Sequence, residues 1–167
     1  IIAIALATNP KLLIADEPTT ALDVTIQEQI LKLMKKLVRE NHTALILITH
    51  DLAVVSRMVD KINVMYCGKL VETGTTEDVI KRNAHPYTEG LLNSIPKLYE
   101  DRERLDFIPG MVPNMFDLPA GCYFAPRCKY CQEICRSQQP QMREIAPGHK
   151  AACHFPLIRE KAEGEVE

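Results

Sequence analysis

The sequence predicts an α/β protein with a mainly parallel sheet. Two short apolar runs, 11–15 and 43–49, are typical of strands, and an amphipathic pattern between them predicts a helix that ends near Glu40. A second helix over 51–59 and then a hairpin are predicted to follow. This order of strand, helix, strand, helix and hairpin is the observation that indicates the fold class.

The first elements can be justified in chain order. Residues 1–8 are predicted to be helical, with Asn9-Pro10 as the helix stop. The continuous apolar run 11–15 predicts a strand that is buried on both faces. Thr25-x-x-Glu28 has the form of a capping box at the start of the next helix. Apolar residues then recur at helical spacing: Ile30, Leu31, Met34, Leu37 and Val38.

The later elements are shorter. The runs 61–66 and 69–73 flank Cys67-Gly68 and predict a hairpin. Helices are predicted over 75–82, which has acidic residues in its first turn, and over 87–94. Beyond these elements prolines recur, and the sequence predicts no regular structure.

Composition limits the classes of protein. The chain has 167 residues, 46% of them hydrophobic, which is enough to form a core. Its net charge of -2 does not favour nucleic acid as a partner. It has no apolar run of the roughly 18–20 residues needed to cross a bilayer, so we expect any membrane association to go through a partner. Because the chain starts at Ile1 within a helical apolar segment, we expect it to be part of a longer protein.

A change of composition predicts two domains, 1–84 and 85–167. In the first, Asp16 and Glu17 follow one predicted strand and His50 follows the other, so all three belong at the carboxyl edge of a sheet. Asp16 could hold Mg²⁺, Glu17 could orient or deprotonate a water, and His50 could donate to a phosphate. Taken singly, these residues have structural explanations: Asp16-Glu17-Pro18 can start a turn, and a lone histidine after a strand is more often a loop residue with satisfied hydrogen bonds. Asp23, a few residues further on, can cap a helix.

The segment Leu12–Glu17 resembles the Walker B strand of the ATP-binding subunits of ABC transporters. Thr20-Ala21-Leu22-Asp23 resembles their D-loop, with threonine where the family often has serine, and His50 resembles the H-loop histidine. The resemblance implies an ATPase that uses ATP and Mg²⁺. It also implies that this chain supplies the C-terminal half of a P-loop ABC nucleotide-binding domain.

The same resemblance implies the roles of these residues. Asp16 would support Mg²⁺, Glu17 would be the general base and His50 would contact the γ-phosphate. The D-loop residues would face a second ATPase subunit, identical or paralogous: Ala21, Leu22 and Asp23. The Walker A loop and the signature segment of the family are absent from these 167 residues. We therefore predict that the isolated chain hydrolyses no ATP.

Residues 85–88, 91–96, 108–113 and 121–128 look like the C-terminal extension of the ATPases of oligopeptide and dipeptide importers. This narrower resemblance implies a peripheral protein on the cytoplasmic face of the membrane. It also implies transmembrane permease subunits as partners and a solute-binding protein as an indirect one. Nickel importers share parts of the pattern and are an alternative.

Four cysteines in the second predicted domain are candidate metal ligands: Cys122, Cys128, Cys135 and Cys153. Four thiolates on loops stiffened by proline could hold a [4Fe–4S] cluster or a Zn²⁺ ion, and their spacing leaves both open. The family resemblance favours the cluster. Either group would act as a structural staple for an irregular segment.

Other residues of this region leave alternatives. Cys128-x-x-Cys131 is a tighter pair, but by resemblance we expect Cys131 to be a bystander. His149 and His154 could bind Zn²⁺ or could be ordinary loop residues. Disulfides fit a cytosolic chain poorly, and Cys67 is expected to be an inert thiol of the hairpin.

Two other classes of function are compatible with parts of the sequence. A soluble ABC ATPase of DNA repair or translation would have a similar Walker B strand and H-loop, although the segments in 85–128 and the lack of basic patches argue against it. A chain complete as given could instead be a stand-alone metal-binding module without enzymatic activity.

Overall fold

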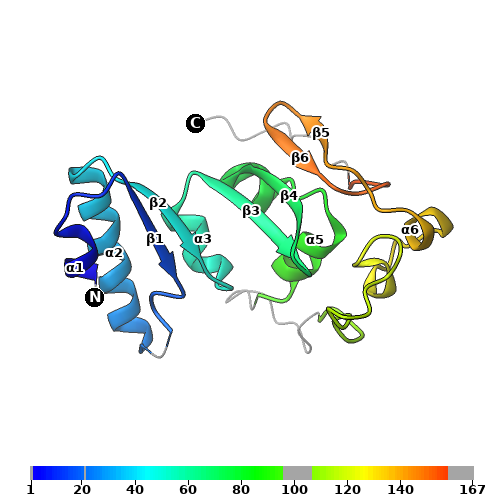
Figure 1. Ribbon diagram of the computed structural model, residues 1–167, viewed down its shortest axis with the longest axis horizontal. Helices are drawn as coiled ribbons and strands as arrows, with labels where there is room; N and C mark the ends of the chain where they lie inside the picture. The colour runs from blue at the N-terminus through cyan, green and yellow to red at the C-terminus, as the bar shows by residue number, and fades with distance from the viewer. Residues whose placement is uncertain (1, 21, 96–106, 158–167) are drawn as a thin grey trace. The chain divides into compact units, whose positions relative to one another are not determined.

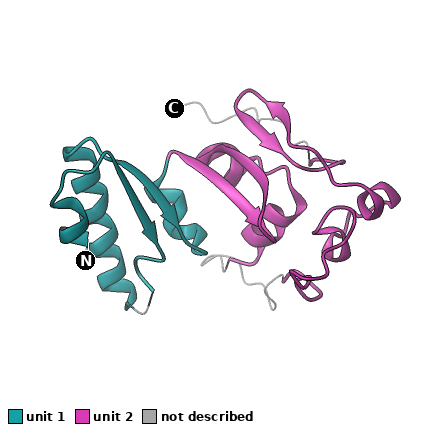
Figure 2. Ribbon diagram, in the orientation of Figure 1, with its two compact units in different colours: residues 1–59 teal, residues 60–167 magenta. Residues whose placement is uncertain are grey.

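The computed structural model describes residues 2–20, 22–95 and 107–157. The chain divides into two compact units, Ile1–Val59 and Asp60–Glu167, called here the first and second units (Figure 2). The two-domain division at 84/85 stays a prediction. In chain order the elements are α1 (Ile2–Leu6), β1 (Leu12–Asp16), α2 (Val24–Glu40), β2 (Ala44–Ile48), α3 (Leu52–Met58), β3 (Lys61–Tyr66), β4 (Lys69–Thr75), α4 (Thr76–Lys81), α5 (Pro86–Asn93), the 3₁₀ helix η1 (Ala125–Arg127), α6 (Glu133–Ser137), β5 (Arg143–Ala146) and β6 (His149–Ala151) (Figure 1).

The first unit has a parallel pair of strands with helices packed against one face. Leu12 of β1 pairs with Ala44 of β2, and Asp16 pairs with Ile48, so both strands end at the same edge. The core on the covered face consists of Leu6, Leu13, Ala15, Leu31 and Met34. Met34 of α2 is completely buried, as its place in the predicted apolar stripe requires.

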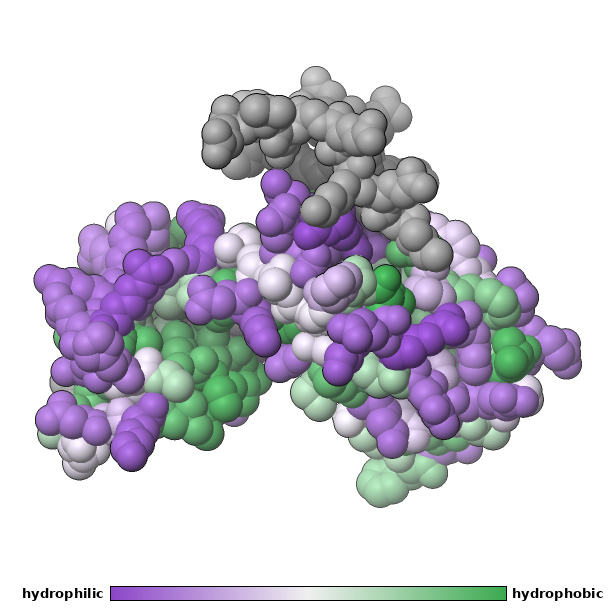
Figure 3. All heavy atoms as spheres, turned by 90° about the horizontal axis from the view of Figure 1, so that it is seen from above, coloured by the Kyte–Doolittle hydropathy of each residue, from purple (hydrophilic) through white to green (hydrophobic). Residues whose placement is uncertain are grey.

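The other face of β1 and β2 is exposed, so the prediction of a strand buried on both faces is wrong for this chain. Ile14 is 60% exposed, and its pairing partner Ile46 is 47% exposed. Leu12 and Ile48 are similarly exposed. The helices that form the core all contribute to the opposite face, and Figure 3 shows apolar surface on this unit. A contiguous apolar surface of this kind is typical of a face that another part of a protein covers.

The ends of the first two helices have clear causes. Asn9 adopts a left-handed backbone (φ 49°) and its N–H donates to the carbonyl of Leu6, which ends α1 before Pro10. The predicted capping box at Thr25 is wrong, because Thr25 already lies inside α2. The cap is Asp23, whose Oδ1 accepts the backbone N–H groups of Thr25 and Ile26, each at 3.0 Å.

The second unit has a four-stranded sheet in the order β3-β4-β6-β5, with every neighbouring pair antiparallel. The expectation of a mainly parallel sheet is therefore wrong, since among the described strands β1 and β2 are the one parallel pair. The hairpin β3–β4 confirms the prediction. Its two turn residues, Cys67 (φ 44°) and Gly68 (φ 74°), both have the positive φ of a type I′ turn.

The remaining elements of the second unit fall into two groups. The predicted helices are present as α4, which Thr75 caps through its hydroxyl, and α5, which starts with Pro86. The 3₁₀ helix η1, the short helix α6 and the strands β5 and β6 were not predicted. These elements have three to five residues, which is too short for a periodic pattern. Within the described residues no helix is long and apolar enough to cross a membrane.

Candidate functional site

The first candidate site lies where β1 and β2 end. Asp16 is the last residue of β1, and the N–H of Glu17 donates to the carbonyl of Ile48, which extends the pairing by one bond of 2.9 Å. Glu17 has a left-handed backbone (φ 45°), which is uncommon for a residue with a side chain. Such strain is found most often at functional positions.

This geometry brings Glu17 and His50 together. Nδ1 of His50 donates to Oε1 of Glu17 at 2.7 Å, and the hydroxyl of Thr20 donates to Oε2 at 3.0 Å. The hydrogen bond from His50 lowers the pKa of Glu17, with a further contribution from Thr20. Glu17 is therefore held as a carboxylate at neutral pH, which is the state that a general base requires.

The predicted D-loop residues have different positions. Ala21 lies outside the described residues. Leu22 is exposed and its N–H donates to the carbonyl of Thr19. Asp23 caps α2, so the structural explanation of this residue holds, and its predicted contact with a second subunit stays a prediction.

Sequence reasoning missed a link beside His50. Oδ1 of Asp51 caps α3 by accepting the N–H groups of Ala53 and Val54, and Oδ2 accepts from Nε2 of Gln27 at 3.2 Å. The starts of α2 and α3 are thereby joined. The cap could have been predicted from the aspartate at the first position of the helix expected over 51–59, whereas nothing in the sequence indicates the bond from Gln27.

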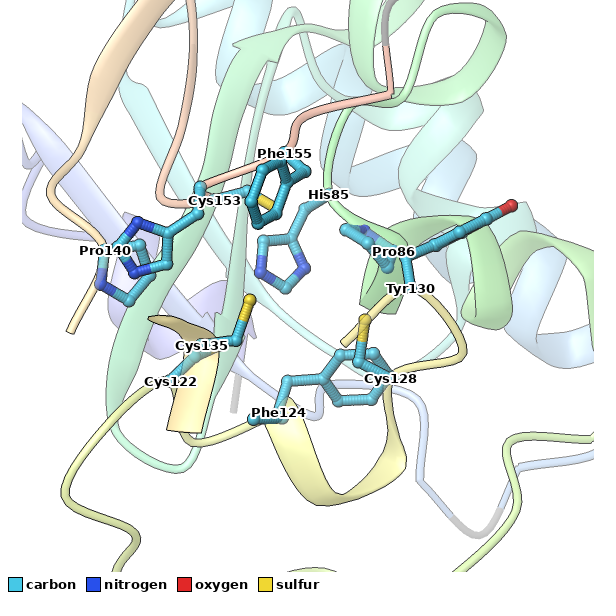
Figure 4. Close-up of a pocket in the computed structure, with 12 residues that line it drawn as sticks. His85, Pro86, Cys122, Phe124, Cys128, Tyr130, Cys135, Pro140, Cys153 and Phe155 are labelled. Atoms are coloured by element: carbon cyan, nitrogen blue, oxygen red, sulfur yellow. The ribbon is translucent and has the colours of Figure 1, made fainter. Parts of the chain in front are cut away.

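The second candidate site is a pocket in the second unit that all four predicted cysteines line (Figure 4). The other lining residues are His85, Pro86, Phe124, Ala125, Tyr130, Pro140, His154 and Phe155. Cys122 and Cys128 lie on either side of η1, Cys135 lies in α6, and Cys153 follows β6. The chain thus brings together thiols that are up to 31 positions apart in sequence, counting from Cys122 to Cys153.

Three of the four cysteines are joined by short-range backbone contacts. The N–H of Cys122 donates to the carbonyl of Cys135 at 2.8 Å. Gly121 permits this approach, since a Cβ there would lie only 2.3 Å from the same carbonyl oxygen. The N–H of Ala125 donates to the carbonyl of Cys122 at 2.9 Å, and the N–H of Cys128 donates to the carbonyl of Ala125 at 3.3 Å, so the turn of η1 connects Cys122 to Cys128.

Burial raises the pKa of Cys122 and Cys153, and it raises the pKa of Cys128 to about 11. Backbone N–H groups oppose this effect by donating to the sulfurs: Phe124 and Ala125 to Cys122, Tyr130 to Cys128, and Phe155 to Cys153. These three thiols are therefore protonated at neutral pH, and a bound metal would have to displace their protons. N–H donors to sulfur are among the features that tune thiolate-held clusters.

The remaining candidate ligands are placed differently. Cys131 does not line the pocket. His149 is buried, and its Nε2 lies 2.7 Å from Oε1 of Glu72. His154 lines the pocket, with Nε2 3.0 Å from the carbonyl oxygen of Gln138. Among the residues that the structure describes, no three His, Cys, Asp or Glu side chains gather closely enough to hold a single metal ion.

His85 lines the pocket, and its chemistry was not predicted from the sequence. It is 1% exposed, and Figure 4 shows its ring in the middle of the pocket, with Cys128, Cys135 and Cys153 around it. Nδ1 accepts the N–H of Tyr87 at 3.1 Å, so His85 caps the start of α5. Burial lowers the pKa of His85 to about 4, so the ring is neutral at physiological pH.

Comparisons with known proteins find a family model and several relatives of this chain. Residues 71–135 match the family model described as oligopeptide/dipeptide transporter, C-terminal region. The dipeptide transport ATP-binding protein DppD of Escherichia coli (strain K12) is 50% identical over 156 residues, which are 93% of this chain and 48% of that protein. The chain spans about half the length of the curated relatives that it matches.

Two further relatives have similar names. The oligopeptide transport ATP-binding protein OppD of E. coli (strain K12) is 52% identical over 156 residues, 93% of this chain and 46% of that protein. The oligopeptide transport ATP-binding protein AppD of Bacillus subtilis (strain 168) is 53% identical over 152 residues, 91% of this chain and 46% of that protein. The chain is thus similar over nearly its whole length to ATP-binding proteins named for oligopeptide and dipeptide transport, and its residues 71–135 match the C-terminal region of that transporter family.

Proposed function

We propose that these residues form part of the ATP-hydrolysing, energy-coupling subunit of an ABC importer for dipeptides or oligopeptides. The observation that carries the proposal is the 2.7 Å contact between Glu17 and His50, beside Asp16 at the end of a parallel strand pair. In this proposal Asp16 supports Mg²⁺, Glu17 is the general base for the attacking water and His50 contacts the γ-phosphate of ATP. The names of the relatives support the same activity.

The proposed function as an ABC importer ATPase also implies protein partners. We propose that Ala21, Leu22 and Asp23 face a second ATPase subunit, identical or paralogous. ATP binding would close the two subunits, and the motion would reach transmembrane permease subunits and, indirectly, a solute-binding protein. The protein would lie at the cytoplasmic face of the membrane. The exposed apolar face of β1 and β2 suits coverage by the phosphate-binding half of an ATPase domain, which these residues do not include.

ATP hydrolysis tests this proposal. The isolated chain is expected to release no phosphate from ATP, because it has no loop that cradles the phosphates. The longer ATP-binding protein that contains this segment should hydrolyse ATP with Mg²⁺, and with its permease in vesicles it should drive peptide uptake. Phosphate release by the isolated chain would contradict the expectation that hydrolysis needs a phosphate-binding loop that these residues lack.

We further propose that Cys122, Cys128, Cys135 and Cys153 hold a [4Fe–4S] cluster. Their fit to the cluster rests on the donor set, which consists of four thiols around one pocket with backbone N–H groups on three sulfurs. A bound cluster would supply a structural cross-link between four separate segments. Zn²⁺ is the runner-up, because thiolates also bind zinc.

Anaerobic purification followed by metal analysis separates the two metals. A cluster should give a broad absorption band near 400 nm and about four irons per chain. Replacement of Cys135 by serine should remove the band, whereas Cys131→Ser should keep it, because Cys131 does not line the pocket. A colourless protein with one zinc per chain would replace the cluster with a zinc site.

The alternatives have less support. A nickel importer is not favoured, since the relatives described above are named for peptide transport. An ATPase of DNA repair or translation would not account for the match over residues 71–135. A stand-alone metal-binding module would leave the pairing of Glu17 with His50 without a purpose.

A further inference from the structure

Hydrogen bonds hold the backbone on both sides of His50, at the start of α3. The hydroxyl oxygen of Thr49 accepts the N–H of Asp51 at 3.1 Å. Oδ1 of Asp51 in turn accepts the N–H groups of Ala53 and Val54. These bonds engage the backbone N–H of Asp51 and one of its two carboxylate oxygens, so Oδ2 can make a contact outside this turn.

The outside contact of Asp51 is with Gln27 of α2. Nε2 of Gln27 donates to Oδ2 of Asp51 at 3.2 Å, across 24 positions of sequence. An ionised carboxylate only accepts hydrogen bonds, so the amide must present its NH₂ group and not its oxygen. Both residues are half-buried, where a hydrogen bond is stronger than in open water. The bond therefore fixes the position of Asp51 relative to α2.

The start of α2 is in turn held close to Glu17. The hydroxyl of Thr20 donates to Oε2 of Glu17 at 3.0 Å, and the N–H of Thr20 donates to the carbonyl of Glu17 at 3.2 Å. Three positions later Asp23 caps α2, and the N–H of Gln27 donates to the carbonyl of Asp23 at 2.8 Å. Gln27 thus lies one turn into the helix whose start follows the segment that holds Glu17.

These contacts and the chain between them form a closed circuit. It runs from Glu17 to the start of α2, from Gln27 of that helix to Asp51, and from the adjacent His50 back to Glu17 through the 2.7 Å contact. The side chain of His50 is 86% exposed, so packing does little to hold its ring in place. The position of the ring relative to Glu17 therefore depends on the backbone around His50, which the bond from Gln27 holds.

We infer that Gln27 is a positioning residue for the proposed ATPase: its amide holds Asp51 and thereby keeps the ring of His50 against the carboxylate of Glu17. The inference rests on the proposed function, because it takes Glu17 as the general base and His50 as the contact to the γ-phosphate. Gln27 donates to Asp51 and not to either of these side chains, so it acts through Asp51 and is not itself a catalytic residue.

Two substitutions break this bond and then restore it with the opposite direction. Gln27→Glu keeps the size of the side chain but places a second carboxylate against Asp51, so the donor is lost and two like charges meet. Adding Asp51→Asn supplies an amide NH₂ that can donate to the new carboxylate, and asparagine caps a helix as well as aspartate does. Gln29→Glu is the matched control, because Gln29 lies on the same helix and is exposed.

The first test is ATP turnover by the longer ATP-binding protein that contains this segment. Gln27→Glu should lower kcat about five- to tenfold, as expected for the loss of one hydrogen bond, and should leave KM for MgATP within about twofold. The double variant Gln27→Glu/Asp51→Asn should recover kcat to within about threefold of wild type, and Gln29→Glu should stay within about twofold. An unchanged kcat in Gln27→Glu, an equal fall in Gln29→Glu, or no recovery in the double variant would overturn the inference.

The second test needs no ATP. Ring ¹⁵N signals of His50, recorded where the ring is neutral, should place its proton on Nδ1 in wild type, since Nδ1 donates to Glu17. In Gln27→Glu the proton should shift towards Nε2, and in the double variant it should return. A wild-type proton on Nε2, or no shift in Gln27→Glu, would overturn the inference.

The two tests separate this inference from the proposed function. If the longer wild-type protein hydrolysed no ATP, the proposed function would fail, while the signals of His50 would still decide what Gln27 holds in place. If turnover were normal and the signals of His50 did not respond to Gln27→Glu, only the inference would fail. Should Gln27→Glu not fold, Gln27→Ala removes the donor without adding a charge and should give the same fall in kcat and the same shift of the proton.

Discussion

Replacing Glu17 with glutamine is expected to slow ATP hydrolysis by about 10²- to 10⁴-fold, the usual contribution of a general base. The amide keeps the size of the side chain but cannot take a proton from water. Oε1 of Glu17 accepts from Nδ1 of His50 at 2.7 Å, so an amide oxygen can keep that contact while the chemistry is lost. The measurement is phosphate release by the longer ATP-binding protein that contains this segment, with ATP binding measured in parallel.

Glu40→Gln is the matched control for this substitution. Glu40 is the last residue of α2 and pairs at the surface with Lys36, so the same chemical change should leave turnover within about twofold. The hydrogen bond from His50 lowers the pKa of Glu17, so this side chain is a carboxylate at neutral pH. It becomes protonated, and activity is lost, only as the pH falls through the lowered pKa. The acid limb of the rate profile should therefore lie below the ordinary range of glutamate. Equal turnover by Glu17→Gln and wild type would rule out Glu17 as the base.

Replacing Glu72 with alanine is expected to destabilise the second unit by about 3–5 kcal/mol, because several buried hydrogen-bonding groups lose their partner at about 1–3 kcal/mol each. The substitution leaves His149 without its carboxylate and leaves the N–H groups of Ala84 and His85 buried without acceptors. Glu72 is 0% exposed, so water cannot readily replace the lost hydrogen bonds. Urea unfolding of the purified chain measures the effect.

Glu77→Ala is the control for that experiment. Glu77 lies two positions into α4 and pairs with Arg82 at 3.5 Å, with a side chain that is 60% exposed. Its loss should cost no more than about 0.5–1 kcal/mol. Glu72→Gln should fall between the two, because an amide can still accept some of the bonds while it loses the charge. If Glu72→Ala unfolded at the same urea concentration as Glu77→Ala, the buried network would have little energetic importance.

Much of the first unit could be predicted from the sequence, because its elements are long enough to show a period. The apolar stripe with Met34 on α2 and the two strands that end at Asp16 and Ile48 follow from local patterns. The pairing of Glu17 with His50 follows from the rule that parallel strands end at a common edge. The exposure of Ile14 could not be read locally, because an apolar strand has the same sequence whether or not a second layer covers it.

The second unit was harder to predict, for physical reasons that can be named. Strands β5 and β6 have four and three residues, and β6 exists because it pairs with β4, far away in sequence. The grouping of Cys122 with Cys135 depends on the absence of a side chain at Gly121. This steric requirement cannot be predicted from the amino-acid composition. The four cysteines were recognisable as a set because they are chemically distinctive, whereas His85 was not, since its ring is placed by burial and by one contact with the backbone of Tyr87.

The pairing of β6 with β4 has a consequence for the order in which the chain can fold. Glu72 is synthesised 77 positions before its partner His149. Until β6 has been made, the hairpin β3–β4 has one unpaired strand edge, and Glu72 is not yet buried. Contacts of such long range close late, because the entropy of the intervening loop opposes them. The backbone contacts that group Cys122, Cys128 and Cys135 span few residues and can form earlier. Three of the four candidate ligands would then be in place before β6 pairs and brings in Cys153. During this interval the nascent protein is most exposed to mispairing and to oxidation of its thiols.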